Sequence, residues 1–136
     1  MIPLQSELTG KEFDFIHSKN ELFRLDFSFG GNWDYDHGSF DKFLDSEQKV
    51  WLRIPFRMTQ GEMDAEVQDT EARIVFKQPF VLKHLYQEGL DEEARFTAMG
   101  GFVNQFQDPV DKDADIEQIW VEEARAVLEQ AERLFS

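Results

Sequence analysis

The chain has 136 residues, contains no cysteine, and carries a formal net charge of −14 from 28 acidic and 14 basic side chains. This length predicts a single domain, residues 1–136, with a core large enough to need neither a disulfide nor a structural metal. The lack of cysteine excludes disulfides, thiol nucleophiles and iron–sulfur clusters, and the acidic balance without clustered Lys and Arg argues against binding to nucleic acid or to an anionic membrane surface.

The first predicted element is a helix over about residues 10–23. Thr9 is followed three residues later by Glu12, the spacing of a capping box, in which each side chain satisfies a backbone amide of the other residue. Phe13 and Phe23 fall on one face of such a helix. We therefore expect the helix to be capped by Thr9 and to carry these rings on one face.

Residues 33–43 show the alternation of a half-buried strand. Aromatic residues and His37 alternate with two aspartates and a glycine as far as Gly38. The strand then continues through Phe40 and Phe43, where the apolar positions shift by one residue. We interpret Gly38 as the site of a bulge that permits this shift.

The clearest strand of the sequence spans residues 49–58. One face is apolar and holds Leu52, Ile54, Phe56 and Met58, and the other holds Trp51, Arg53, Pro55 and Arg57. Since Pro55 has no backbone N–H to donate to a sheet ladder, this strand should lie at an edge of the sheet or contain a local break at Pro55.

Two shorter segments follow a polar loop over residues 59–71. Residues 72–78 alternate as a strand, whereas 80–86 fit either a strand or a buried helical turn. The second clear helix covers about 115–134, with apolar residues at three- and four-residue spacing. Its apolar face holds Ile116, Ile119, Trp120, Ala124, Val127, Leu128, Ala131, Leu134 and Phe135.

The order helix, consecutive strands, helix predicts an α+β fold. Strands joined by short turns pair antiparallel, and we expect about four to five of them. An N-terminal and a C-terminal helix then pack on one face of this sheet, as a two-layer sandwich. The 14 phenylalanines predict a core rich in aromatic rings.

One acidic segment has the spacing of a calcium-binding loop. Asp111, Asp113, Asp115 and Glu122 occupy positions 1, 3, 5 and 12 of an EF-hand pattern, but Ile116 stands where the sharp turn requires glycine. An acidic start to the C-terminal helix explains the same residues. We therefore expect no metal site there.

The three histidines are His17, His37 and His84, and their spacing is not that of a helical zinc pair. His37 stands near Asp34, Asp36 and Asp41, but strand alternation sends Asp34 and Asp36 to the opposite face. A hydrogen-bonded strand histidine is therefore favoured over a metal ligand. No nucleophile elbow, phosphate-binding loop or dinucleotide motif occurs. The sequence thus predicts no catalytic, cofactor-binding or metal-binding residue.

The one site that we predict is a contact or ligand surface formed by His37, Trp51, Arg53, Arg57 and His84. Trp51 is an apolar ring on the outward face of its strand, and aromatic residues and Arg are enriched at protein interfaces. A twofold homodimer is the simplest such contact, and the competing explanation is that the loop 59–71 covers Trp51 within one chain. Arg53 and Arg57 either bind an anion or neutralise neighbouring carboxylates, and the second role suits so acidic a chain better.

Four segments carry a resemblance to a known family: FGGNWDYDHGSFD (29–41), LRIPFR (52–57), QPFVLKHLYQEGLDEEA (78–94) and FVNQFQDPVDKDA (102–114). With the SELTG run near the start, the sequence resembles the YugN-like family nearly end to end. These are small proteins of spore-forming Gram-positive bacteria. The resemblance implies a two-layer α/β sandwich, with helices packed on an antiparallel sheet, and implies no reaction, cofactor or partner.

We expect a soluble, cytoplasmic protein. The first residues lack the basic and apolar regions of a signal peptide, and no apolar run is long enough to cross a bilayer. The first functional hypothesis is a non-enzymatic domain, without a cofactor, that acts through protein or small-molecule contact. The alternative is an enzyme of unrecognised type with an Asp, His and Arg site on the sheet.

Overall fold

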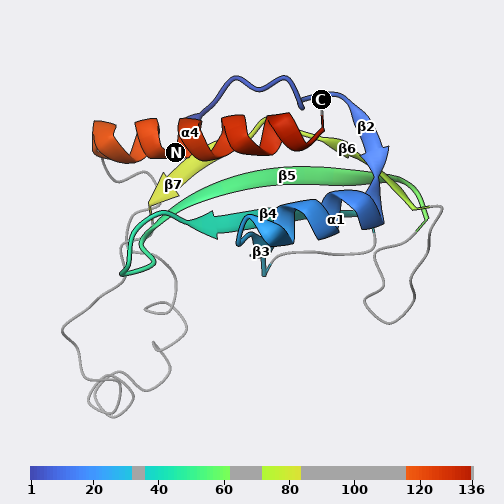
Figure 1. Ribbon diagram of the computed structural model, residues 1–136, viewed down its shortest axis with the longest axis horizontal. Helices are drawn as coiled ribbons and strands as arrows, with labels where there is room; N and C mark the ends of the chain where they lie inside the picture. Colours follow the sequence, from blue (N-terminus) through green and yellow to red (C-terminus); the bar gives the residue numbers. More distant parts are fainter. Residues whose placement is uncertain (32–35, 62–71, 84–115, 136) are drawn as a thin grey trace, which may run out of the picture.

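The computed structural model describes residues 1–31, 36–61, 72–83 and 116–135. These residues form one antiparallel sheet of seven strands and two helices (Figure 1), so the fold is α+β as predicted. The strands are β1 (Ile2–Pro3), β2 (Glu12–Asp14), β3 (Ser28–Phe29), β4 (His37–Phe43), β5 (Val50–Gln60), β6 (Arg73–Phe76) and β7 (Phe80–Lys83). The helices are α1 (Phe15–Arg24) and α4 (Gln118–Leu134).

The sheet has more strands than the four to five that we expected. Its order is β1-β7-β5-β4-β3, and β6 pairs with both β5 and β2. The strands missed in the sequence are β1, β2 and β3, which have only two or three residues each. A two-residue strand shows no alternation, so its pairing is determined by its neighbours and not by its own pattern.

Strand β5 lies inside the sheet, and the prediction of an edge strand is wrong. On one side it pairs with β4 along seven residues, and on the other it pairs first with β7 and then with β6. Pro55 lies where β7 pairing ends and β6 pairing begins, and its carbonyl accepts a hydrogen bond from the Lys77 amide at 2.8 Å. Since the N–H and C=O of a strand residue point to the same side, Pro55 faces this break. The alternative of a local break at Pro55 is confirmed.

The predicted alternation along β5 is confirmed, and its apolar side chains are buried. The bulge predicted at Gly38 is absent, because β4 and β5 pair in one continuous register from His37 to Phe43. Phe40 therefore faces the core and is fully buried, whereas Phe43 lies on the same face as His37 and is 44% exposed. The two phenylalanines lie on opposite faces of one regular strand.

The N-terminal helix is shorter than predicted and has a different cap. Gly10 has a φ of +82°, which no α-helical residue adopts. Residues 12–14 instead pair with β6, and Phe13 packs its ring against those of Phe76 and Phe135. The N-cap is Asp14, whose carboxylate accepts a hydrogen bond from the His17 amide at 2.8 Å. The capping box predicted at Thr9 is therefore wrong.

Helix α4 begins at Gln118, and residue 115, where we placed its start, lies outside the described residues. The helix buries Ala124, Val127, Leu128 and Ala131 as predicted, and also Val121, which was not predicted. Ile119 was assigned to the buried face but is 61% exposed. Near its C-terminal end, Glu132 accepts hydrogen bonds from the Ser6 hydroxyl at 2.9 Å and the Glu7 amide at 2.8 Å, which fastens the N-terminal segment to this helix.

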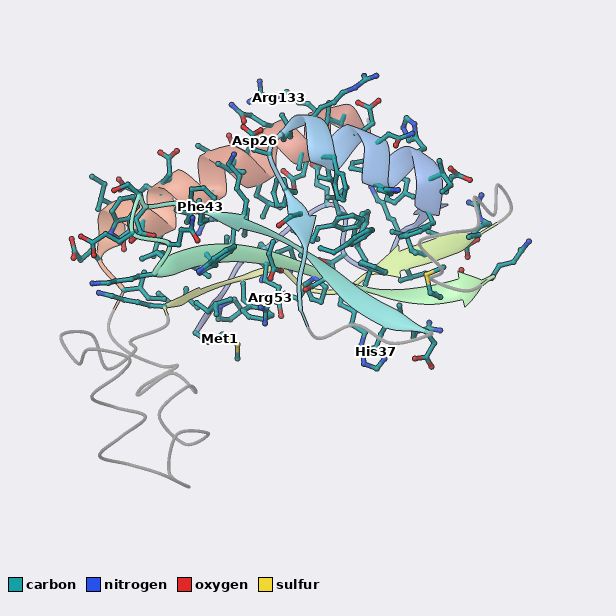
Figure 2. The ribbon with its side chains drawn as sticks, turned by 90° about the horizontal axis from the view of Figure 1, so that it is seen from below. Met1, Asp26, His37, Phe43, Arg53 and Arg133 are labelled. Atoms are coloured by element: carbon teal, nitrogen blue, oxygen red, sulfur yellow. The ribbon has the colours of Figure 1, made fainter. Side chains whose placement is uncertain are left out.

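Both helices lie on the same side of the sheet, as Figure 2 shows. Between them and the sheet is a core in which Phe40, Phe56 and Phe76 are almost completely buried. The rings of Phe40 and Phe56 are 5.0 Å apart between centroids, which agrees with the predicted aromatic core. Neither described helix combines the length and apolar character that crossing a bilayer requires. The opposite face of the sheet carries no described helix.

Candidate functional site

The face of the sheet opposite the helices carries most of the surface residues that we predicted. We call it the helix-free face because no helix of the described residues lies on it. It is defined by alternate residues of two strands: His37, Ser39, Asp41 and Phe43 on β4, and Trp51, Arg53, Pro55 and Arg57 on β5. The register arranges them in rows, with His37 opposite Arg57, Asp41 opposite Arg53 and Phe43 opposite Trp51. Figure 2 shows His37 and Arg53 on the side away from the helices.

The centre of the helix-free face is a largely buried ion pair between Asp41 and Arg53. Arg53 Nε donates to Asp41 Oδ1 at 3.0 Å, and Arg53 Nη2 donates to Asp41 Oδ2 at 2.9 Å. The Asp41 side chain is 7% exposed and the Arg53 side chain 25%. The guanidinium also lies 5.9 Å from the centroid of the Phe80 ring. This bidentate geometry holds Arg53 in one orientation, so the centre of the face is rigid and electrically neutral.

Gly30 allows β3 to approach this ion pair closely. Its amide donates to the Ser39 carbonyl at 2.9 Å. A Cβ atom at this position would lie 2.2 Å from Ser39 Oγ and 2.8 Å from Asp41 Oδ2. Any side chain at Gly30 would therefore displace the carboxylate that Arg53 holds.

One end of the helix-free face is aromatic. The rings of Phe43 and Trp51 meet edge to face, with centroids 5.7 Å apart. Trp51 Nε1 donates to the Gln48 carbonyl at 2.8 Å, within the loop that joins β4 to β5. Since its one polar atom already has a partner, the half-buried Trp51 presents mainly apolar surface. Leu82 of β7 lies opposite it in the sheet and is buried.

The other end of the helix-free face carries positive charge. Arg57 and Lys77 are exposed, and neither side chain has an ion-pair partner among the residues that the structure describes. Arg73, by contrast, pairs with Glu12. His37 lies in the same row as Arg57, and its Nδ1 is 2.9 Å from the Asp36 carboxylate. The face thus changes from aromatic to cationic along its two strands.

A separate hollow of about 340 Å³ lies beside the loop between β4 and β5. It is lined by Asp45, Ser46, Glu47, Lys49, Val50, Lys83, Glu117 and Trp120. Asp45 is already occupied, since it accepts hydrogen bonds from the Lys49 and Val50 amides at 2.8 and 2.9 Å. Lys49 pairs with Glu47 at 2.7 Å. Three carboxylates and two ammonium groups surround the hollow, so it carries no strong excess of either charge.

Comparison with known proteins agrees with this architecture. The sequence model of the YugN-like family matches residues 3–135. The chain belongs to the YugN-like family. It is 29% identical over 133 residues to a Bacillus subtilis (strain 168) relative named uncharacterized protein YugN, which covers 97% of this chain and 96% of the relative.

The fold of this YugN-like chain is also similar to a crystal structure. That structure, the uncharacterized conserved protein YugN from Geobacillus kaustophilus HTA426, superimposes with a TM-score of 0.69. The match covers 98% of this chain and 94% of the crystallised chain, at 18% sequence identity. At that identity the comparison establishes the shared fold alone.

Four of the five residues predicted for a contact surface lie on the helix-free face. His37, Trp51, Arg53 and Arg57 share it, in the rows described above. His84 lies outside the described residues. Of the two arginines, Arg53 neutralises a neighbouring carboxylate as we favoured, whereas Arg57 has no carboxylate within ion-pair distance in the described part of the chain.

The sequence did not reveal Asp41 and Phe43 as members of this face. The signal was present, because both are an even number of residues from His37 and strict alternation puts all three on one side. The bulge that we predicted at Gly38 would have moved Asp41 and Phe43 to the other face, so the alternation was not followed past Gly38. Gly30 had no detectable signal, since its role depends on the distance between β3 and β4.

Of the calcium-like segment, Asp111, Asp113 and Asp115 lie outside the described residues. Glu122 is exposed on α4. No group of three or more His, Asp or Glu side chains is close enough to hold a metal ion in the described ranges. The loop 62–71, which we considered as a cover for Trp51, also lies outside them.

Proposed function

We propose that this chain is a non-enzymatic, cytoplasmic binding protein that contacts a protein partner through its helix-free face. The observation that carries the proposal is the edge-to-face pair of exposed Phe43 and half-buried Trp51. Beside it lie Arg53, which Asp41 holds, and Arg57, which has no ion-pair partner among the described residues. Large aromatic rings and Arg are the residues most enriched at the energetic centres of interfaces. A ring that is 44% exposed gains free energy when a partner removes it from water.

The rigidity of the face supports a binding role. Arg53 is held by hydrogen bonds to both Asp41 oxygens, and Trp51 is held by its bond to the Gln48 carbonyl. Side chains that are already ordered lose little rotamer entropy when a partner binds. The face also lies on two long paired strands, so its residues keep their relative positions.

The geometry favours binding over the alternative of an enzyme with an Asp, His and Arg site. General acid–base catalysis requires the groups to be within hydrogen-bonding reach of the same reacting atoms. His37 and Asp41 are four residues apart on one strand, which corresponds to about 13 Å. The Asp41 carboxylate is engaged by Arg53, and the His37 imidazole contacts Asp36. Asp36 and His37 do lie together beside Arg57, but their side chains are 75% and 51% exposed, without the burial that tunes a catalytic pair.

The proposal can be tested by crosslinking cells that produce the chain with formaldehyde and then fractionating the complexes, so that a weakly bound partner is retained. We expect the wild-type chain to elute above the mass of its 16.0 kDa monomer, and the Trp51→Ser variant to elute at the monomer mass. Ile119→Ser is the matched control, because Ile119 is an exposed apolar residue on α4, on the other side of the sheet. The proposal is wrong if Trp51→Ser, shown by circular dichroism to be folded, elutes with the wild type.

A further inference from the structure

The helix-free face has two chemically different ends that complement each other. Trp51 and Phe43 form the aromatic end and Arg57 the cationic end. Trp51 and Arg57 are six residues apart on β5, a distance of about 20 Å. A guanidinium over an indole ring is a favourable cation–π contact, so a second face with the same two ends in reverse order would match this one.

We infer that the partner of the helix-free face is a second copy of this chain, packed face to face around a twofold axis that crosses the strands. This inference rests on the proposed function, and it names the partner and its orientation. Such an axis passes through the row of Phe40 and Ile54, midway between the two ends. Arg57 of each copy then lies over the aromatic pair of the other, and both contacts form at once.

The charge pattern selects this orientation over the other twofold arrangement. An axis parallel to the strands would bring Arg57 of one copy against Arg57 of the other, and like charges across an interface oppose association. The crossing axis separates the two arginines by the length of the face. The centre of the face is compatible with close approach, because Arg53 is already neutralised by Asp41 within each copy.

The size of the face limits the class of complex that it can form. Seven paired rows span about 24 Å, and the four strands β7, β5, β4 and β3 span about 19 Å. The projected contact is therefore at most about 450 Å² per copy, because β7 and β3 border only part of the seven rows and Ser39, Asp41 and Leu82 are already buried. This is at the low end for specific complexes. We expect a reversible dimer with a dissociation constant in the micromolar range, weakened further by the net charge of −14 on each copy.

Sedimentation equilibrium of the purified chain tests the inference. The runs cover about 10 to 300 µM protein in 300 mM NaCl, because salt screens the repulsion between the acidic copies. We expect the average mass to rise from 16.0 kDa toward twice that value. Arg57→Glu should weaken the association at least tenfold. Arg125→Glu, an equal charge change at an exposed position of α4, should associate like the wild type.

Two outcomes would overturn the inference: a wild-type chain that stays monomeric at 300 µM, or an Arg57→Glu variant that associates as strongly as the wild type and Arg125→Glu. A melting curve of each variant establishes that it is folded. If the purified chain is monomeric but cell extracts contain a larger complex that Trp51→Ser abolishes, the helix-free face binds a different protein. In that case the proposed function stands and the second copy is excluded. If neither association occurs, both are wrong.

Discussion

The substitution Gly30→Ala should destabilise the protein through a contact that the sequence does not reveal. The added Cβ would lie 2.2 Å from Ser39 Oγ and 2.8 Å from Asp41 Oδ2. Non-bonded atoms of this kind need more than about 3 Å, so both side chains must move. The Ser39 hydroxyl can rotate away, but the Asp41 carboxylate is held by Arg53 at 2.9 and 3.0 Å and is 7% exposed.

The expected cost follows from these contacts. Overpacking a tight site costs about 1–3 kcal/mol, and lengthening a charge-assisted hydrogen bond removes part of its contribution of about 1.5–3 kcal/mol. Replacing glycine also stabilises the folded protein by up to about 1 kcal/mol, because the unfolded chain becomes less flexible. We therefore expect Gly30→Ala to lower the free energy of unfolding by about 2 kcal/mol. Gly31→Ala is the control, since a Cβ at Gly31 meets no atom within 4 Å.

Urea denaturation of the two variants provides the measurement. The midpoint of Gly30→Ala should fall, with an unchanged slope, and Gly31→Ala should stay within about 0.5 kcal/mol of the wild type or be slightly more stable. In a Ser39→Ala background the cost of Gly30→Ala should shrink, because the nearer of the two clashing atoms is gone. Equal midpoints for Gly30→Ala and Gly31→Ala would refute the reasoning.

Three further substitutions test the packing. Arg53→Leu leaves the Asp41 carboxylate buried without a partner and should lower the free energy of unfolding by about 3–5 kcal/mol. The double variant with Asp41→Leu should recover most of this loss. A double variant no more stable than Arg53→Leu would contradict the prediction. Glu132→Ala removes two hydrogen bonds to the N-terminal segment and should lower the free energy of unfolding by about 1–2 kcal/mol. Glu129 is exposed, so Glu129→Ala should change the stability little. Urea midpoints of the two variants provide the comparison. Leu128→Ala truncates a side chain that is 2% exposed and should lower the free energy of unfolding, measured by calorimetry, by about 2–5 kcal/mol. A melting temperature within error of the wild type would show that this face of α4 is not part of the core.

The parts of the fold that could be predicted from the sequence are those with a long, regular pattern. β5 alternates over its whole length, and α4 repeats its apolar residues at helical spacing for four turns. In both elements the residues themselves determine which face is buried. The break at Pro55 was also foreseeable, since proline cannot donate a ladder hydrogen bond.

The parts that could not be predicted depend on contacts between distant segments. The capping box at Thr9 is a sound local signal, but residues 12–14 pair with β6 about 60 residues later, and this pairing prevents a helical start. The position of β5 inside the sheet depends on β6 and β7 sharing one of its sides. The candidate surface was partly predictable, because Trp51, Arg53 and Arg57 show it directly, whereas Phe43 was hidden by a bulge that does not exist.

The central claim is that the helix-free face contacts a protein partner, and photocrosslinking tests it most directly. A photoreactive phenylalanine analogue replaces Phe43, which is 44% exposed on this face, and in a second variant it replaces Ile119, which is 61% exposed on α4. After irradiation of cells that produce each variant, we predict a discrete adduct of one mass from position 43 and none of that mass from position 119. Absence of any adduct at position 43, or the same adduct from both positions, would contradict the account.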